Sequence, residues 1–324
     1  SHQVDWWGIV FLASFIGSLQ FVLEHGQQDD WFNDPVIVIL SVVTVVGLLA
    51  FIWREMTYSH PIVNLKVLKD SNLRIGTFMC FILGFGLYGS TLIIPIYTQQ
   101  VLGWTATQAG LLLIPGSITT AFMMPIIGNL IQKGVPQQYL VSIGFLIFFF
   151  FTFWMHNAMT PDTGVEHLFW PLILRGIGLG LLFVPITTMA LSTLKGKSIG
   201  EGAAFTGMMR QLGGSFGIAI ITTYITRLSQ EHRVRLVAHL DTSKLEVQQR
   251  VSQMQQAFVS KGFTPNESLG KAYQAMDYSV MKQATVLSYM DIFLYLGLMF
   301  LCCIPIMIMI KRSKNKINPA DAMH

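Results

Sequence analysis

Charge is scarce in this sequence. Of its 324 residues only 12% are Asp, Glu, Lys or Arg, whereas 52% are apolar, and the mean hydropathy is +0.53. Soluble domains carry roughly 25% charged residues, and disordered chains are poor in apolar ones. The composition therefore excludes a disordered chain and argues against an ordinary soluble globule.

Residues that carry covalent or metal chemistry are also few. The three cysteines, Cys80, Cys302 and Cys303, all lie inside long apolar segments, which predicts neither a disulfide framework nor a zinc site. The eight histidines lie in polar segments or at the ends of apolar ones, without metal-ligand spacing. No nucleophile elbow, phosphate-binding loop or paired carboxylates within an apolar segment are present. We therefore expect no metal, no cofactor, no enzyme activity and no nucleic-acid binding.

What the sequence does contain is eight long segments that are almost free of charge. A membrane-spanning helix needs ~20 apolar residues, because ~30 Å of hydrocarbon is crossed at ~1.5 Å per residue. The segments have 18 to 27 residues each and are 6–23, 35–53, 75–98, 107–131, 138–155, 168–193, 202–226 and 284–310. The sequence therefore predicts an all-α integral membrane protein with eight transmembrane helices.

The cations of the short connections lie in alternate connections, and therefore on one side of this arrangement. Eleven Lys and Arg residues lie in the connection 54–74, in the two later connections that contain Lys133 and Lys195, and in the tail after residue 310. The short connections on the other side, around 24–34, 99–106 and 156–167, contain none. Short cytoplasmic connections retain Lys and Arg. We therefore expect a multi-pass protein of the inner (cytoplasmic) membrane with both ends of this chain in the cytoplasm.

The connection 227–283 is long, carries eight Lys or Arg residues, and is expected outside the cell membrane, since long loops cross largely regardless of charge. Ser243 with Glu246, and Thr264 with Glu267, have the spacing of capping boxes, and each pair precedes apolar residues at helical spacing. Two amphipathic helices are predicted here. They serve either as a cap over the last loop or as a hairpin that docks a partner.

Three charged residues lie inside the predicted spans. A charge at the bilayer centre costs at least ~2.5–3.5 kcal/mol, so it normally has a partner or a function. Arg175 and Asp291 are expected about 10 Å deep from the outer side, which allows an ion pair, although Asp291 could instead titrate in a proton path. Arg210 is expected about 12 Å deep from the cytoplasmic side and has no acid at its level, so we interpret it as a substrate-binding or partner-binding residue.

Small, aromatic and sulfur-containing residues also concentrate in the predicted spans. Glycine allows helices to approach closely, and proline allows a local break. The candidate packing or gating positions are Gly176, Gly178, Gly180, Gly213, Gly214, Gly217, Pro115 and Pro185. Soft side chains suit a cavity for apolar cations, and the candidates for substrate contact or proton coupling are Arg210, Asp291, Arg175, Tyr97, Gln99, Met123 and Met124.

Four stretches of the sequence together resemble one family of transporters. Residues 94–103 and 105–116 look like the ninth-to-tenth-span region of the fourteen-span drug:proton antiporters of the major facilitator superfamily, the EmrB/QacA type. The run from Arg175 to Gly180 resembles the twelfth span of that family, and residues 210–219 resemble the thirteenth. Gly26 with Trp31 is similar to the hairpin that joins the two additional central spans.

This resemblance implies that the chain corresponds to the C-terminal portion of such a transporter. Residues 1–70 would be the two-span central insert with a cytoplasmic linker, and residues 71–324 the C-terminal six-span bundle, with 227–283 as an extracytoplasmic helical loop. The interspan loop motif of the superfamily is degenerate here, with Gln132 at its acidic position. Transport uses a site between two halves, so we expect no activity without the six-span N-terminal half.

Several functions stay open at this stage. The main interpretation is the C-terminal part of a proton-coupled multidrug efflux transporter that works by alternating access on apolar or cationic substrates. An exporter of a specific metabolite, such as a fatty acid or a siderophore, is the first alternative. A non-transporting scaffold or split half is the second. Gram-negative members of the family work with a periplasmic adaptor and an outer-membrane channel, which are therefore expected partners besides membrane lipid.

Overall fold

The computed structural model describes residues 5–59, 65–240 and 244–308, and within these ranges it contains helices and connections but no strand. The helices are α1 (Trp6–His25), α2 (Pro35–Thr57), α3 (Ser71–Gln100), α4 (Ala106–Gln132), α5 (Gln137–Ala158), α6 (Val165–Leu191), α7 (Lys197–His239), α8 (Leu245–Val259) and α9 (Pro265–Ile308). Short 3-10 turns, Trp31–Asn33 and Leu65–Lys69, lie before α2 and α3.

Each predicted span coincides with a helix of this structure. Seven of the described helices, α1 to α6 and α9, are long and apolar enough to cross a membrane. α7 contains more polar residues along its length and does not meet that test, but it packs along α3 and α9 inside the bundle. The prediction of an all-α integral membrane protein is confirmed.

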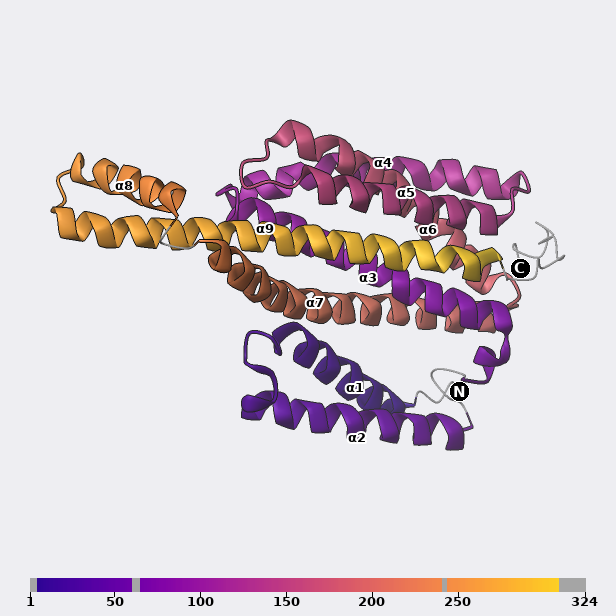
Figure 1. Cartoon of the computed structure of the whole chain (residues 1–324). Coiled ribbons are helices and arrows are strands. Elements are labelled where there is room, and N and C mark those ends of the chain that lie inside the picture. Colours follow the sequence, from indigo (N-terminus) through magenta and orange to yellow (C-terminus); the bar gives the residue numbers. More distant parts are fainter. Residues whose placement is uncertain (1–4, 60–64, 241–243, 309–324) are drawn as a thin grey trace.

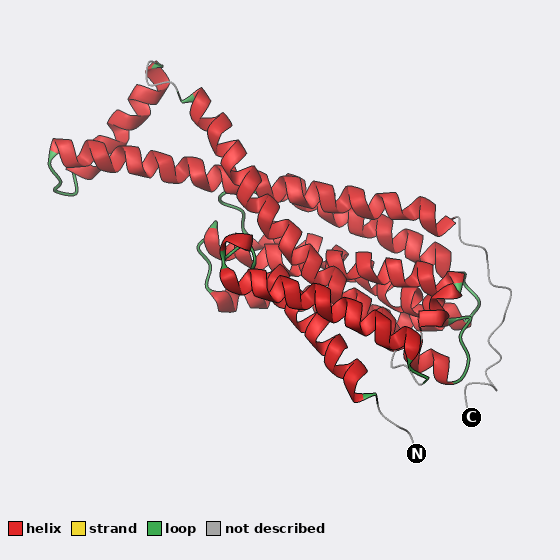
Figure 2. Ribbon diagram, turned by 90° about the horizontal axis from the view of Figure 1, so that it is seen from below, coloured by secondary structure: helices red, strands yellow, loops and turns green. Residues whose placement is uncertain are grey.

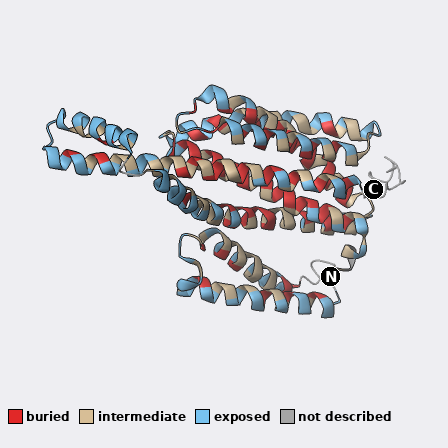
Figure 3. Ribbon diagram, in the orientation of Figure 1, coloured by how far each residue is buried: buried red, intermediate tan, exposed pale blue. Residues whose placement is uncertain are grey.

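Helices α3 to α7 and the second half of α9 form one bundle, and the α1–α2 hairpin lies beside it (Figure 1). α3 contacts α7 and α6, α4 packs on α6, and α5 lies between α6 and α9 with extensive contacts to both. The hairpin touches the bundle through α1, which contacts α7. Most side chains of α2 are accordingly exposed (Figure 3).

The bundle is held by close helix contact, because burial of apolar surface drives little association between helices in lipid. Gly84 of α3 and Gly213 of α7 lie at the crossing of their two helices. A Cβ on Gly84 would overlap the carbonyl oxygen of Arg210, and a Cβ on Gly213 would overlap that of Phe81. Only glycine permits the backbones of α3 and α7 to approach so closely. Between α5 and α9 the contact is aromatic, with Phe148 and Phe300 at a ring-centroid distance of 4.3 Å.

The α1–α2 hairpin is closed at both ends. Asp5 caps α1 by accepting a hydrogen bond from the backbone N–H of Gly8 (3.1 Å), and its carboxylate pairs with Arg54 of α2 (3.0 Å). At the other end the Trp31 ring covers Gly26, where a Cβ would lie 2.5 Å from the ring. Asp34 caps α2, and Pro35 occupies its first position, where a missing N–H costs nothing.

Residues 227–240 and 244–283 form an arm that projects from the bundle (Figure 2). α7 and α9 have 43 and 44 residues, which is about 65 Å at ~1.5 Å per residue, whereas ~30 Å suffices to cross the hydrocarbon. The arm therefore consists of the end of α7, the separate helix α8 and the beginning of α9. Its side chains are mostly exposed (Figure 3).

This arm corrects one sequence-based expectation. The second predicted amphipathic helix is not a separate element but the first part of α9, which continues into the membrane span. Its predicted capping box is confirmed, since Thr264 Oγ1 accepts from the N–H of Glu267 and the Glu267 carboxylate accepts from the N–H of Thr264. The Thr264 hydroxyl also donates to this carboxylate, and this hydrogen bond, with that from the Thr264 N–H, holds the pKa of Glu267 below its usual value. Ser243, of the other predicted box, lies outside the described residues.

Candidate functional site

Three pockets of the bundle reach the level of the predicted spans, and one of them, of about 550 Å³, lies where α4 and α6 begin and is lined by no charged residue. The other two lie between the middle parts of the helices. One has a volume of about 280 Å³ and lies between α3, α4 and α6. Its lining is Leu87, Thr91, Leu113, Ser117, Thr120, Met124, Arg175, Leu179 and Phe183. The other has about 340 Å³ and lies between α3, α7 and α9. The pocket of about 280 Å³ contains a charged residue, and we therefore treat it as the candidate site, called here the Arg175 pocket.

Arg175 is the eleventh residue of α6, about 15 Å from the beginning of that helix at ~1.5 Å per residue. It is 4% exposed. Its Nε donates to Ser90 Oγ (2.9 Å), and its Nη2 donates to the Leu87 carbonyl oxygen (3.4 Å) and to Thr91 Oγ1. All three acceptors belong to α3 and are neutral. Arg175 therefore fastens α6 to α3 and carries its charge into the pocket.

Arg210 of α7 lies next to the same pocket. Its guanidinium carbon is 4.5 Å from the ring centroid of Phe183, which is stacking distance for a cation and an aromatic face. Phe183 also lines the Arg175 pocket. Because Arg175 and Phe183 are eight residues apart on α6, the two arginines are separated by about 12 Å along that helix.

The expected ion pair between Arg175 and Asp291 is not formed. Asp291 of α9 instead accepts a hydrogen bond from His232 of α7, with 2.6 Å between Nε2 and Oδ2. The physical reason is that α5 stands between α6 and α9, and His156 of α5 contacts the Met290 carbonyl oxygen at 2.7 Å. The expectation rested on equal depth alone, but α6 and α9, which carry Arg175 and Asp291, are not neighbouring helices.

The other candidate contact residues fall in different environments. Met124 lines the Arg175 pocket, whereas the Met123 side chain packs against Gly180 of α6. Tyr97 is fully buried, and its hydroxyl donates to the Thr160 carbonyl oxygen (2.6 Å). Gln99 is exposed near the end of α3. The structure thus brings Met124 to Arg175 and leaves Tyr97 and Gln99 away from the pocket.

The candidate glycines lie at contacts between helices of the bundle. A Cβ on Gly176 would overlap the Gly116 carbonyl oxygen of α4, and one on Gly178 would lie 3.2 Å from the Phe148 nitrogen of α5. Gly214 and Gly217 of α7 face Tyr88 and Phe85 of α3. Pro115 and Pro185 lie inside α4 and α6. Their part in gating stays a prediction.

Sequence reasoning missed the residues that complete the site. Ser90 and Thr91 carry no sequence signal beyond being hydroxyl residues in an apolar span. Phe183 is one of 23 phenylalanines. His232 lies on the boundary of an expected loop, and its pairing depends on α7 continuing as a helix past residue 226, which the spacing of polar residues there could have indicated.

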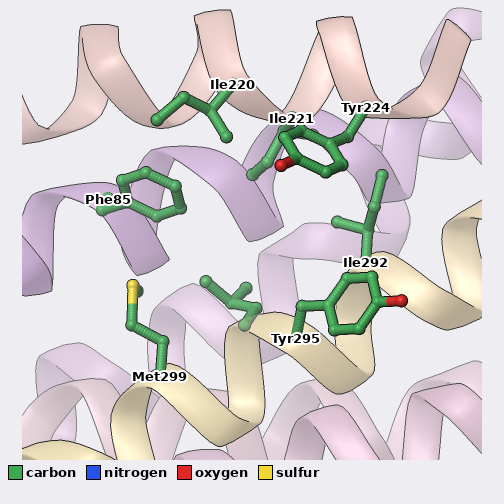
Figure 4. A pocket seen from close by; sticks show the side chains of 8 residues that line it. Phe85, Ile220, Ile221, Tyr224, Ile292, Tyr295 and Met299 are labelled. Atoms are coloured by element: carbon green, nitrogen blue, oxygen red, sulfur yellow. The ribbon is translucent and has the colours of Figure 1, made fainter. Parts of the chain in front are cut away.

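The pocket between α3, α7 and α9 is lined by apolar side chains and two tyrosines (Figure 4). Figure 4 shows Phe85 and Met299 at one end and Tyr224 and Tyr295 at the other, on the facing helices α7 and α9. Its lining contains no ionisable group apart from the two tyrosine hydroxyls. Among the residues that the structure describes, no three His, Cys, Asp or Glu side chains are grouped to hold a metal ion.

Comparison with known proteins agrees with this architecture. The chain is 30% identical over 303 residues to the Fatty acid resistance protein FarB of Neisseria gonorrhoeae. This match covers 93% of the chain and 58% of FarB. The chain is 31% identical over 293 residues to the Multidrug export protein EmrB of Escherichia coli K12, covering 90% and 55%. It is 26% identical over 314 residues to the Colistin resistance protein EmrB of Acinetobacter baumannii, covering 97% and 60%.

The chain thus spans between 55% and 60% of the length of these curated relatives. The family model described as Major Facilitator Superfamily matches residues 7–218, from the first helix to the middle of α7. Together with the helical membrane bundle, these matches show that the chain belongs to the major facilitator superfamily and is similar to its EmrB-type members.

Proposed function

We propose that this chain is the C-terminal part of a proton-coupled multidrug efflux transporter of the bacterial inner membrane. The observation that carries the proposal is the Arg175 pocket, which combines a buried charge, hydroxyl groups and apolar walls in a superfamily bundle. Ligand sites are mostly apolar with a few placed polar groups, as here. The names of two relatives, Multidrug export protein and Colistin resistance protein, support export of small molecules.

In this proposal the pocket faces a second six-span half. Superfamily transporters bind substrate near the bilayer midplane between two halves that rock against each other. Residues 71–324 are the C-terminal bundle, and residues 1–70 are the two-span insert and linker. The close glycine contacts of α3 with α7 and of α4 with α6 would let the bundle move as one body. Asp291 is the single acid within the proposed spans, so further coupling acids belong to the other half.

A cytoplasmic position of both ends of this chain is supported by the cations at Arg54, Arg74, Lys133 and Lys195. The tail cations lie outside the described residues. The arm of α7, α8 and α9 then projects on the outer side. Its exposed helical surface is suited to binding a periplasmic adaptor. The adaptor would connect the transporter to an outer-membrane channel. A scaffold without transport is the competing function, and it would use the same arm.

Reconstitution in proteoliposomes tests this proposal. We expect the chain joined to a six-span N-terminal half of the same family to export a fluorescent apolar substrate when a proton gradient is applied. The chain alone should bind lipid and fold but export nothing. Proton-driven export by the chain alone would contradict the requirement for a second half. Failure of the folded, joined protein with a panel of apolar substrates would contradict transport and favour the scaffold.

A further inference from the structure

The pocket between α3, α7 and α9, called here the α7–α9 groove, opens on the surface of the bundle. Three of its lining residues are about half exposed, namely Ile220 (44%), Tyr224 (50%) and Tyr295 (52%). The groove extends about 10 Å along α9, from Ile292 to Met299, at ~1.5 Å per residue. An apolar groove on the surface of a membrane-spanning bundle faces hydrocarbon, so an acyl chain is the group that matches its walls.

The end of this groove that is nearer to the arm carries its two tyrosines (Figure 4). Figure 4 shows the Tyr295 hydroxyl pointing away from Met299, which lies at the opposite end. Tyrosine is enriched where the hydrocarbon of a membrane meets the polar headgroups, because its ring is apolar and its hydroxyl is polar. The groove therefore leads from headgroup level, at Tyr224 and Tyr295, into the hydrocarbon at Met299.

An acid lies just beyond the tyrosine end of the groove. Asp291 is four residues, about one turn, before Tyr295 on α9. Its Oδ2 accepts a hydrogen bond from His232 Nε2 of α7 (2.6 Å), so the carboxylate stands at the contact between the two helices that form the groove. The side chain is 29% exposed, and no hydrogen bond within the described residues uses its Oδ1. One carboxylate oxygen is thus left to accept hydrogen bonds from a ligand.

A cation lies on the opposite helix at the same end. Arg227 is three residues after Tyr224 and seven after Ile220, and residues at these spacings share one face of a helix. Arg227 therefore lies on the face of α7 that lines the groove, and it directly follows the predicted span 202–226. Its side chain is exposed and forms no ion pair within the described residues.

The acid, the cation and the apolar groove together match a zwitterionic phospholipid with a primary ammonium. Arginine binds phosphate through charge-assisted hydrogen bonds, and a carboxylate accepts such bonds from an ammonium group. Phosphatidylethanolamine carries both groups side by side. Phosphatidylglycerol lacks the ammonium and would bring its negative charge toward Asp291. Phosphatidylcholine has the same net charge as phosphatidylethanolamine but no N–H donor.

We infer that the α7–α9 groove binds one molecule of phosphatidylethanolamine from the leaflet on the side of the arm. The ammonium group donates to Asp291, the phosphate accepts from Arg227, and one acyl chain lies in the groove between Tyr295 and Met299. This inference goes beyond the proposed function, because it concerns a lipid held at one place and applies to a transporter and to a scaffold alike.

Photolabelling of the 324-residue chain in phosphatidylcholine nanodiscs tests the inference. The probe is phosphatidylethanolamine with a diazirine in the upper half of one acyl chain, and the matched control is phosphatidylcholine with the same chain. Labelled peptides should come from the parts of α7 and α9 that line the groove. The ethanolamine probe should label them at least about fivefold more than the choline probe, which corresponds to about 1 kcal/mol, the scale of one hydrogen bond.

Methylation of the probe removes the N–H donors one at a time without changing the charge. Labelling by the monomethyl and dimethyl probes should therefore fall stepwise between the ethanolamine and choline values. The phosphatidylglycerol probe should label the groove no more than the choline probe does. This series uses the unaltered chain, so it stays informative even where a variant fails to fold.

Variants separate the two headgroup contacts. Asp291→Asn keeps the size of the side chain but removes its charge, and should bring the ethanolamine and choline probes to within about twofold of each other. Arg227→Gln should weaken labelling by both probes and leave their ratio unchanged, because the phosphate is common to both lipids. Asp277→Asn is the matched control, since Asp277 is another acid of α9 but pairs with Arg233 on the arm, and it should change neither probe.

Three results would overturn the inference. They are equal labelling of the groove by the ethanolamine and choline probes, labelling of the groove no stronger than that of the exposed face of α2, and an undiminished ethanolamine preference in folded Asp291→Asn. A preference for phosphatidylglycerol would overturn it as well, because Asp291 would then play no part in choosing the lipid.

Discussion

His232 of α7 and Asp291 of α9 form a hydrogen-bonded pair, with 2.6 Å between Nε2 and Oδ2, near the point where the two helices leave the bundle for the arm. Both side chains are only partly exposed. A second contact, between the Ser229 and Thr285 hydroxyls (3.3 Å), lies beside them. The base of the arm is therefore held by polar contacts, whereas the bundle below it is held by close packing.

Replacing either member of this pair should loosen the arm. We expect a coupling free energy of about 0.5–1 kcal/mol between His232→Ala and Asp291→Ala, because a partly screened pair contributes on that scale. Thermal unfolding of the purified single and double variants, monitored on the same detergent-solubilised chain, gives this number. A coupling of zero would mean that the pair adds nothing to stability.

The chain provides a matched comparison for this measurement. Arg233 and Asp277 also join α7 to α9, at 2.7 Å, but about half of each side chain is exposed. Solvent screening should reduce their coupling to a few tenths of a kcal/mol. An Arg233–Asp277 coupling as large as that of His232–Asp291 would contradict the role given to burial.

Glycine at the crossing of α3 and α7 should be irreplaceable. Gly213→Ala places a methyl group on the Phe81 carbonyl oxygen and forces the two helices apart, which should destabilise the bundle by about 1–3 kcal/mol. Gly207 is the control, since it lies on the same helix and a Cβ there meets nothing within 4 Å. Gly207→Ala should be neutral or slightly stabilising, because alanine favours helix more than glycine does. Equal loss of thermal stability in both variants would contradict the close-approach argument.

The contrast between Gly213 and Gly207 shows what the sequence could and could not predict. The lengths of the spans followed directly from the thickness of the bilayer, and within the described residues every predicted span lies in a helix. Which glycine touches a neighbouring backbone depends on the rotation of α7 about its axis, and no local pattern determines that rotation. The same limit applied to Arg175 and Asp291, where depth was predictable but the interposed helix α5 was not.

The Asp5–Arg54 pair should make the α1–α2 hairpin sensitive to acid. Burial raises the pKa of Asp5, but the hydrogen bonds from Arg54 and Gly8 outweigh burial and hold this pKa below its ordinary value of 3.8. A lowered pKa means that the folded hairpin favours the ionised form, so the stabilisation is present above about pH 4 and is lost as the pH falls below that value. Hydrogen exchange in the first turn of α1, corrected for intrinsic rates, should therefore accelerate below pH 4.

Two variants separate this pair from general acid unfolding. Asp5→Asn keeps a capping side chain but removes the charge, and should abolish the acid dependence of the first turn. Arg54→Gln removes the cationic partner of Asp5 and should weaken the acid dependence of the first turn. If exchange in either variant still accelerated as in the unaltered chain, the Asp5 carboxylate would not be the group responsible.

Variants of Arg210 and Phe183 test whether the side of the Arg175 pocket formed by Phe183 takes part in the proposed transport. The guanidinium of Arg210 stacks on Phe183 and forms no ion pair within the described residues, so its charge is not needed to satisfy a carboxylate of this chain. In the proposed transporter, formed by joining this chain to a six-span N-terminal half, Arg210→Ala should abolish drug resistance at unchanged expression, while Arg210→Lys, which keeps the charge and some stacking, should retain part of it. Phe183→Leu keeps an apolar wall but removes the aromatic face, and should lower resistance by less than Arg210→Ala does. Resistance is measured as the inhibitory drug concentration, with the amount of membrane-inserted protein determined in parallel. If resistance survives Arg210→Ala, the stacking on Phe183 only packs α7 against α6, and the charge of Arg210 does not contribute to export.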